Sequence, residues 1–101
     1  MEIRERTKFD CGAILQSDGA IQWRVWAPRT NRLDLVLIDG DARELHAMTV
    51  EKRGFFTFKK EIVPDGQRYA YRLEGGPERP DPASRWQPDG VHHASAVLRT
   101  D

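Results

Sequence analysis

The chain has 101 residues, of which 39% are hydrophobic, so one compact core is expected and a disordered chain is excluded. Its 16 basic and 16 acidic residues give a net charge of zero and form no long block of one sign, which excludes a partner bound mainly by charge, above all a nucleic acid. No apolar run approaches the roughly 20 residues that span a bilayer, and the single cysteine, Cys11, excludes an intramolecular disulfide or a site built from several thiolates.

The chain begins with charged residues, which are followed by a first candidate strand. Residues 1–6 have no apolar region and no small-residue cleavage site, so no secretory signal is visible and we expect a cytoplasmic location. Residues 8–15 are expected to form the first strand. Turn signals then recur at intervals of about ten residues, from residues 17–19 to residues 64–66, and this spacing is typical of a sandwich or a barrel.

The second candidate strand, residues 20–27, has the clearest alternation in the chain. Ile21, Trp23 and Val25 share one of its faces, whereas Arg24 and Trp26 lie on the other. Four more strands are expected at residues 32–38, 43–50, 55–62 and 68–74. The strand at 43–50 is weak and is interpreted as an edge. Residues 64–66, between the last two of these strands, are interpreted as a hairpin turn.

After residue 74 the sequence changes character. Prolines and glycines disfavour both helix and strand here, so residues 75–94 are expected to form a long loop. Loops of this length are uncommon in compact domains and are often functional. A last short strand is expected at residues 95–98. About seven antiparallel strands, with the main ones in residues 8–74, predict an all-β, immunoglobulin-like β-sandwich.

Catalytic and metal-binding constellations are not visible in the sequence. A retaining glycosidase needs two carboxylates about 5 Å apart in a cleft, whereas the acidic residues here fall mainly in turns, where their side chains cap the backbone. His92 and His93 are adjacent and point to opposite sides of an extended segment. We therefore expect no catalytic residue, no metal and no cofactor in this chain.

The three tryptophans carry the remaining functional signal, because flat rings stack on the apolar faces of sugars. Trp23 has the parity of the apolar face and is expected in the core. Trp26 has the opposite parity, which leaves three alternatives: an exposed platform, a contact to a neighbouring domain, or part of a covered outer face. Trp86 lies in the proline-rich loop, where docking on a partner surface or folding back on the domain is expected.

Two stretches resemble the N-terminal modules of α-amylase-superfamily enzymes. In the first, an apolar residue is followed by Arg, an apolar residue, Trp, Ala and Pro, and the motif reads Gly19-Ala20-Ile21-Gln22-Trp23-Arg24-Val25-Trp26-Ala27-Pro28. The second is similar to the final hairpin of the same modules and reads Asp65-Gly66, then Tyr69-Ala70-Tyr71-Arg72-Leu73. The pattern recurs in branching enzymes, isoamylase-type debranching enzymes and trehalohydrolases.

A more specific resemblance lies in the proline-rich loop. It is similar to the segment that joins the module to the catalytic barrel in maltooligosyltrehalose trehalohydrolases, and it reads Pro80-Asp81-Pro82-Ala83-Ser84-Arg85, then Gln87-Pro88-Asp89-Gly90-Val91-His92. Branching and debranching enzymes have a shorter Asp-Pro element at this place. One departure is that His93 and Ala94 follow, where the trehalohydrolases have Gly and Pro.

The resemblance implies that residues 1–101 form one non-catalytic N-terminal module of an α-glucan-active hydrolase. Its (β/α)8 barrel would lie outside this chain, and the whole enzyme would release trehalose from maltooligosyltrehalose. The expected partner is this barrel, on which the module packs and whose cleft it shapes. The candidate interface residues are Trp26, Asp81, Arg85, Trp86, Gln87 and His92, among which Asp81 and Arg85 are expected to make charged contacts.

An alternative function is that of an autonomous module, of a branching or debranching enzyme, that binds α-1,4-glucan as glycogen or maltooligosaccharide. The candidate sugar contacts are then Trp26 and Trp86. A third interpretation, in which the chain is itself an enzyme, has the least support because no acid and base pair can be found.

Overall fold

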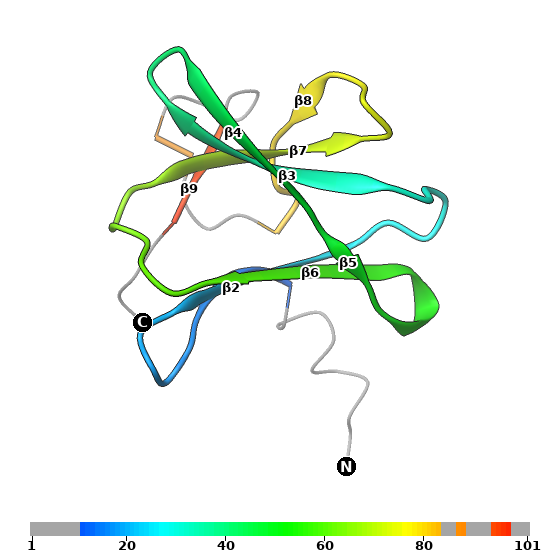
Figure 1. The fold of residues 1–101 in the computed structure, drawn as a ribbon, viewed down its shortest axis with the longest axis horizontal. Helices are drawn as coiled ribbons and strands as arrows, with labels where there is room; N and C mark the ends of the chain where they lie inside the picture. The colour runs from blue at the N-terminus through cyan, green and yellow to red at the C-terminus, as the bar shows by residue number, and fades with distance from the viewer. Residues whose placement is uncertain (1–10, 84–86, 89–93, 98–101) are drawn as a thin grey trace.

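The computed structural model describes residues 11–83, 87, 88 and 94–97 and consists of two antiparallel sheets that pack face to face (Figure 1). The first sheet has the order β1-β2-β6-β5, with strands β1 (Gly12–Leu15), β2 (Ile21–Trp26), β6 (Phe55–Lys60) and β5 (Thr49–Val50). The second sheet has the order β4-β3-β7-β8, with strands β4 (Ala42–Ala47), β3 (Leu33–Asp39), β7 (Arg68–Leu73) and β8 (Glu78–Arg79). A further strand, β9 (Ser95–Ala96), pairs with β7, and a short 3-10 turn, Lys52–Gly54, joins β5 to β6. The predicted immunoglobulin-like β-sandwich is therefore confirmed.

The core lies between the two sheets and contains the apolar face of each long strand. Trp23 on β2 is fully buried, as predicted, and its ring meets the Tyr69 ring of the opposite sheet edge-on, with centroids 5.8 Å apart. Leu35 on β3 and Phe56 on β6 join the same cluster. Period-two alternation places these side chains on one face of their strands, and burial of that face drives the two sheets together.

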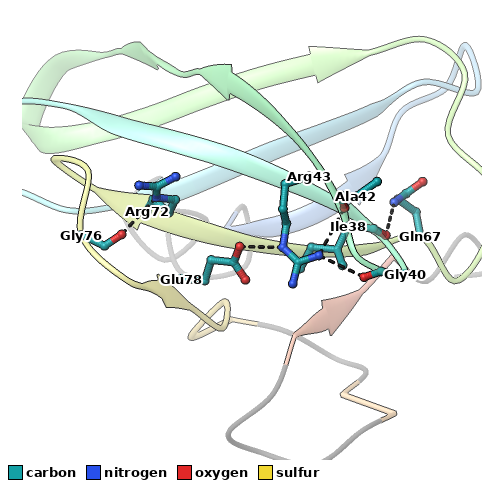
Figure 2. Close-up of polar contacts among 8 residues, drawn as sticks. All are labelled: Ile38, Gly40, Ala42, Arg43, Gln67, Arg72, Gly76 and Glu78. Carbon is teal, nitrogen blue, oxygen red and sulfur yellow. Dashed lines mark hydrogen bonds and ion pairs between the residues drawn. The ribbon is translucent and has the colours of Figure 1, made fainter.

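The outer face of the second sheet is covered by long polar side chains. Val36 and Ala70 point away from the core, yet both are buried. Figure 2 shows the Arg43 side chain bonded to Glu78, with Nε and Oε2 2.7 Å apart, so this ion pair links β4 to β8. The Nε of Arg72 donates a hydrogen bond to the carbonyl oxygen of Gly76, 3.0 Å away. The aliphatic parts of long polar side chains can shield apolar neighbours on such a face.

The strand predicted at residues 43–50 is in fact two strands in different sheets. Its first part, β4, pairs with β3, whereas Thr49 and Val50 pair with β6 in the first sheet (Figure 1). Met48 lies between them with its side chain in the core, and its amide donates a hydrogen bond to the carbonyl oxygen of Leu33, 3.0 Å away. Each part is an edge strand, as predicted for the whole, but the chain crosses between sheets because Met48 turns inward.

The hairpin predicted at residues 64–66 was wrong. The flanking strands β6 and β7 belong to different sheets, so this segment is a crossover between sheets. Val63 is buried in the core at the start of the crossover, and the Gly66 amide donates to the carbonyl oxygen of Val97 at 2.8 Å. An apolar residue next to a turn signal can anchor either connection, so the local sequence did not distinguish them.

The predicted loop at residues 75–94 contains a short strand that sequence reasoning missed. Glu78 and Arg79 form β8, which pairs with Arg72 and Tyr71 on β7. The last strand is shorter than predicted, because β9 contains only residues 95 and 96, and residue 98 lies outside the described residues. Two-residue strands carry too little alternation to be recognised from the sequence.

Candidate functional site

A cleft of about 540 Å³ opens at the end of the sandwich where β2 ends and β3 begins. One side is formed by Trp26 and the start of β3, and the other by the segment from Arg79 to Pro82 together with Gln87. Three residues predicted as site residues, Trp26, Asp81 and Gln87, therefore line the same cleft. Residues 55 positions apart in the sequence are brought together because β7 and β8 place the proline-rich segment beside the end of β2.

Trp26 is the most exposed aromatic residue of the described chain, with 59% of its surface accessible. Its indole Nε1 donates a hydrogen bond to the carbonyl oxygen of Arg53, 2.9 Å away. The ring is tilted by 37° against the Phe55 ring, and the centroids are 6.3 Å apart. Of the three alternatives for this residue, a covered outer face does not fit the exposure, whereas the platform and the contact to another domain stay predictions.

The Arg53 carbonyl that accepts the Trp26 hydrogen bond is positioned by a close approach between the 3-10 turn and the loop after β2. Gly54 has φ of 84°, and a Cβ at this position would lie 2.6 Å from the Cα of Pro28. The Ala27 amide donates to the Gly54 carbonyl oxygen at 2.8 Å. A glycine at position 54 thus lets the 3-10 turn reach the loop after β2, and the turn presents the Arg53 carbonyl to the indole.

The Arg24 side chain packs on the Phe55 ring. The Arg24 guanidinium carbon lies 4.0 Å from the centroid of the Phe55 ring, and its Nε lies 3.2 Å from a carboxyl oxygen of Glu51. Trp26, Phe55 and Arg24 all belong to the outer face of the first sheet because their strands pair in register. The Phe55 ring therefore contacts both the Arg24 guanidinium and the Trp26 ring.

Asp81 forms the floor of the cleft and is 3% exposed. Its Oδ2 accepts hydrogen bonds from the hydroxyls of Tyr69, at 2.5 Å, and Tyr71, at 3.4 Å. Its Oδ1 accepts from the Ala83 amide at 2.9 Å, and its own amide donates to Ser95 Oγ at 3.0 Å. Asp81 thus ties the proline-rich segment to β7 and β9. The charged contact to another domain that was expected of it stays a prediction.

Burial changes the pKa values of Asp81 and Tyr71, which line the cleft. Burial raises the pKa of Asp81 above its usual value, although the hydrogen bonds from Tyr69, Ala83 and Tyr71 act in the opposite direction. Burial likewise raises the pKa of Tyr71 well above 10.0, and the nearby charge of Asp81 adds to this effect. Both changes favour the uncharged forms of the two side chains.

The rim of the cleft carries two further polar residues. Arg79, which sequence reasoning missed, is exposed on β8, and its guanidinium has no hydrogen-bond partner among the described residues. Gln87 is half-buried beside it. The other predicted site residues, Arg85, Trp86 and His92, lie outside the described residues. Arg79 could have been found only from the position of β8, because the sequence around it reads as a loop.

The described part of the chain contains neither a metal-binding cluster nor a membrane-spanning helix. Within residues 11–83, 87, 88 and 94–97, no three His, Cys, Asp or Glu side chains gather in a way that could hold a metal ion. His46, the one described histidine, stacks on Phe58 with centroids 4.6 Å apart. In the same described part of the chain, no helix has the length and apolar character needed to cross a bilayer.

Solved structures place this sandwich among the β-modules of α-amylase-family enzymes. A candidate α-amylase from Salmonella typhimurium superposes with a TM-score of 0.80 and 30% identity, over 88% of this chain and 15% of that one. Pullulanase from Bacillus acidopullulyticus gives a TM-score of 0.75 at 20% identity, over 88% of this chain and 12% of that one, and supports the fold alone.

Sequence comparison narrows this class to one family. Residues 10–87 match the model of carbohydrate-binding module 48, the isoamylase N-terminal domain, and the chain belongs to this family. It is also similar to malto-oligosyltrehalose trehalohydrolases, with 37% identity over 90 residues to that of Saccharolobus solfataricus and 40% over 75 residues to that of Mycobacterium tuberculosis H37Rv. These matches cover 89% and 73% of this chain but only 15% and 12% of the relatives. Both resemblances noted in the sequence are confirmed.

Proposed function

We propose that the chain is the non-catalytic N-terminal module of an α-glucan-active glycoside hydrolase of the maltooligosyltrehalose trehalohydrolase type. It packs on the catalytic (β/α)8 barrel of the same polypeptide and shapes one side of the substrate cleft. A cytoplasmic location belongs to the same proposal. The observation that carries it is the extent of the matches, because most of this chain aligns with a small part of each trehalohydrolase.

The chemistry of the described residues supports a role without catalysis. The buried carboxyl in the cleft, that of Asp81, is occupied by hydrogen bonds from Tyr69, Tyr71 and Ala83. A glycosidase would need a second carboxylate about 5 Å from it. The residues that line the cleft include no other acid. The reaction would therefore depend on the barrel.

Substitution of Arg85 tests the packing proposal. In the full-length enzyme we expect Arg85→Ala to lower both the melting temperature and the release of trehalose, because a charged contact between module and barrel would be lost. A matched control is Arg29→Ala, which removes an exposed arginine of the loop between β2 and β3. Differential scanning calorimetry and a trehalose assay give the two readouts. Unchanged stability and activity in the Arg85 variant would count against this interface.

A second candidate function is autonomous binding of α-1,4-glucan. Two observations favour it: the chain belongs to a carbohydrate-binding family, and Trp26 presents an exposed, supported ring. Calorimetric titration of the chain with maltoheptaose tests this function directly. Saturable heat supports it, whereas no heat from a folded sample contradicts it and leaves packing on the barrel as the role of the module.

A further inference from the structure

Strand β4 forms the longest sheet edge in the described part of the chain. It has six residues, Ala42–Ala47, and among the described strands it pairs with β3 alone. The other edge strands are shorter, with four residues in β1 and two each in β5 and β8. Natural edge strands commonly contain Pro, Lys or a bulge that prevents further pairing. Strand β4 contains neither Pro nor Lys, and its register with β3 is unbroken.

The backbone groups of alternate β4 residues point away from β3. The amide of Met48, directly after the strand, donates a hydrogen bond to the carbonyl oxygen of Leu33 on β3, 3.0 Å away. Backbone direction alternates along a strand, so every second position back from Met48 also faces β3. The N–H and C=O groups of the remaining positions, Arg43, Leu45 and Ala47, therefore point out from the edge. Such a row of groups is a template for another strand.

The sequence of β4 matches a second copy of itself in one antiparallel register. With a two-fold axis through Leu45, this residue lies opposite Leu45 of the second copy, and Arg43 lies opposite Ala47 of the second copy. Each outward N–H group then meets an outward C=O group of the other copy. A shift by one residue would instead place these groups opposite positions whose backbone already faces β3.

The side chains in this register are complementary on both faces of the strand. Leu45 lies beside Val36 on the outer face of the second sheet and is 46% exposed, so contact with a second Leu45 would remove apolar surface from water. On the inner face, Glu44 would lie opposite His46 of the second copy. These two side chains already interact within one chain, with Nε2 and Oε2 2.7 Å apart. No two like charges are therefore directly opposite each other.

We propose that β4 binds a second copy of this chain by antiparallel edge pairing, with the two-fold axis through Leu45, so that the two second sheets become one continuous sheet. An edge of this length falls at the low end of interface sizes, below roughly 1,200 Å². The dimer is therefore reversible, with a dissociation constant of roughly 10–1,000 µM. No residue of β4 lines the cleft beside Trp26, so this interface is separate from the candidate site and independent of the functions proposed above.

Sedimentation equilibrium of the chain over a concentration series tests the association. We expect the parent chain to shift from monomer to dimer as its concentration rises. Leu45→Lys should weaken the dimer about tenfold or more, because the axis places the two lysines opposite each other. The matched control is Val50→Lys, which introduces the same charge at a side chain of β5 that is 61% exposed and should leave the dissociation constant unchanged. Circular dichroism verifies the fold of both variants.

Amide hydrogen exchange tests the register without any substitution. The amides of Arg43, Leu45 and Ala47 should exchange more slowly as the concentration of the parent chain rises. Those of Glu44 and His46 face β3 and should be protected to the same degree at every concentration. Strong protection of the three outward amides even in dilute solution would mean that another segment of the same chain covers the edge, and would overturn the proposal.

Two results of sedimentation would also overturn it. One is a chain that stays monomeric up to about millimolar concentration, the weak end of the expected range. The other is a dimer that Leu45→Lys and Val50→Lys affect equally, because the contact would then lie elsewhere on the surface. Neither result bears on packing against the barrel or on binding of a glucan.

Discussion

Asp81 was predicted at a domain interface, and the structure shows it buried within the module itself. The sequence predicts that it makes a charged contact with another domain, and the structure buries it against two tyrosines of β7. Such a carboxyl is costly to ionise, because burial removes the water that would stabilise the charge. The hydrogen bonds offset part of this cost but leave the pKa raised.

The raised pKa of Asp81 predicts a pH-dependent stability. The folded protein holds the Asp81 proton more tightly than the unfolded chain, whose pKa is near 3.8. The contribution of this group to the free energy of unfolding is thus fully present below pH 3.8 and is lost as the pH rises through the folded-state pKa. We expect Asp81→Asn, which cannot ionise, to remove this decline. Urea unfolding measured at a series of pH values checks it.

Two other carboxyls have lowered pKa values and change the stability with pH in the opposite direction. The effect of Asp81 must therefore be measured against a control variant. Hydrogen bonds from Ala20 and from Asn31 lower the pKa values of Asp18 and Glu74, whose contributions are present at higher pH and lost as the pH falls through their folded-state pKa values. Asp18 and Glu74 contribute equally to the parent protein and to Asp81→Asn. Their contributions therefore cancel in the difference between the two curves of unfolding free energy against pH. Asp41→Asn, at an exposed turn, serves as the control. If the two variants gave the same slope, the protonation assigned to Asp81 would be incorrect.

Gly54 is a second residue whose role depends on what surrounds it. We expect Gly54→Ala to lower the free energy of unfolding by about 2–4 kcal/mol. The alanine would have to adopt a left-handed backbone conformation, and its Cβ would clash with Pro28. Gly40→Ala shares the positive φ but has open space around it, so its cost should be about 1 kcal/mol. Urea denaturation measures both. Equal losses would mean that the contact with Pro28 has no energetic weight.

The segment of residues 42–50 is the element that local patterns describe least well. Its poor alternation reflects a real change of sheet, because β4 and β5 pair with different partners. An edge strand makes hydrogen bonds on one side only, so a single buried side chain can decide where pairing stops. Met48 is that side chain here.

Truncation of Met48 tests this account of the crossing. We expect Met48→Ala to destabilise the protein by about 2–3 kcal/mol, since a buried methionine leaves a cavity in the core. Val50→Ala, two residues further and 61% exposed, should change stability by less than about 0.5 kcal/mol. Thermal and urea unfolding provide the measurement. A small loss for Met48 would show that the crossing is held by the backbone hydrogen bond to Leu33 instead.

The cleft depends on how the two sheets of the sandwich pack together. Trp26 lies on the first sheet, Arg79 lies on β8 of the second sheet, and Asp81 follows β8. The three residues line one cleft because the two sheets pack with the proline-rich segment beside the end of β2. The family match extends through this segment to residue 87.

The alternation in residues 20–27 and 68–74 was enough to predict the strands, the burial of Trp23 and the sandwich, because period-two burial is a local property of the chain. The motifs around Trp26 and Asp81 were enough to indicate the family. Tertiary structure alone decided that residues 64–66 cross between sheets, that β8 forms, and that Asp81 and Arg79 share a cleft with Trp26. Those features depend on contacts between distant segments, and no local pattern encodes which segments will meet.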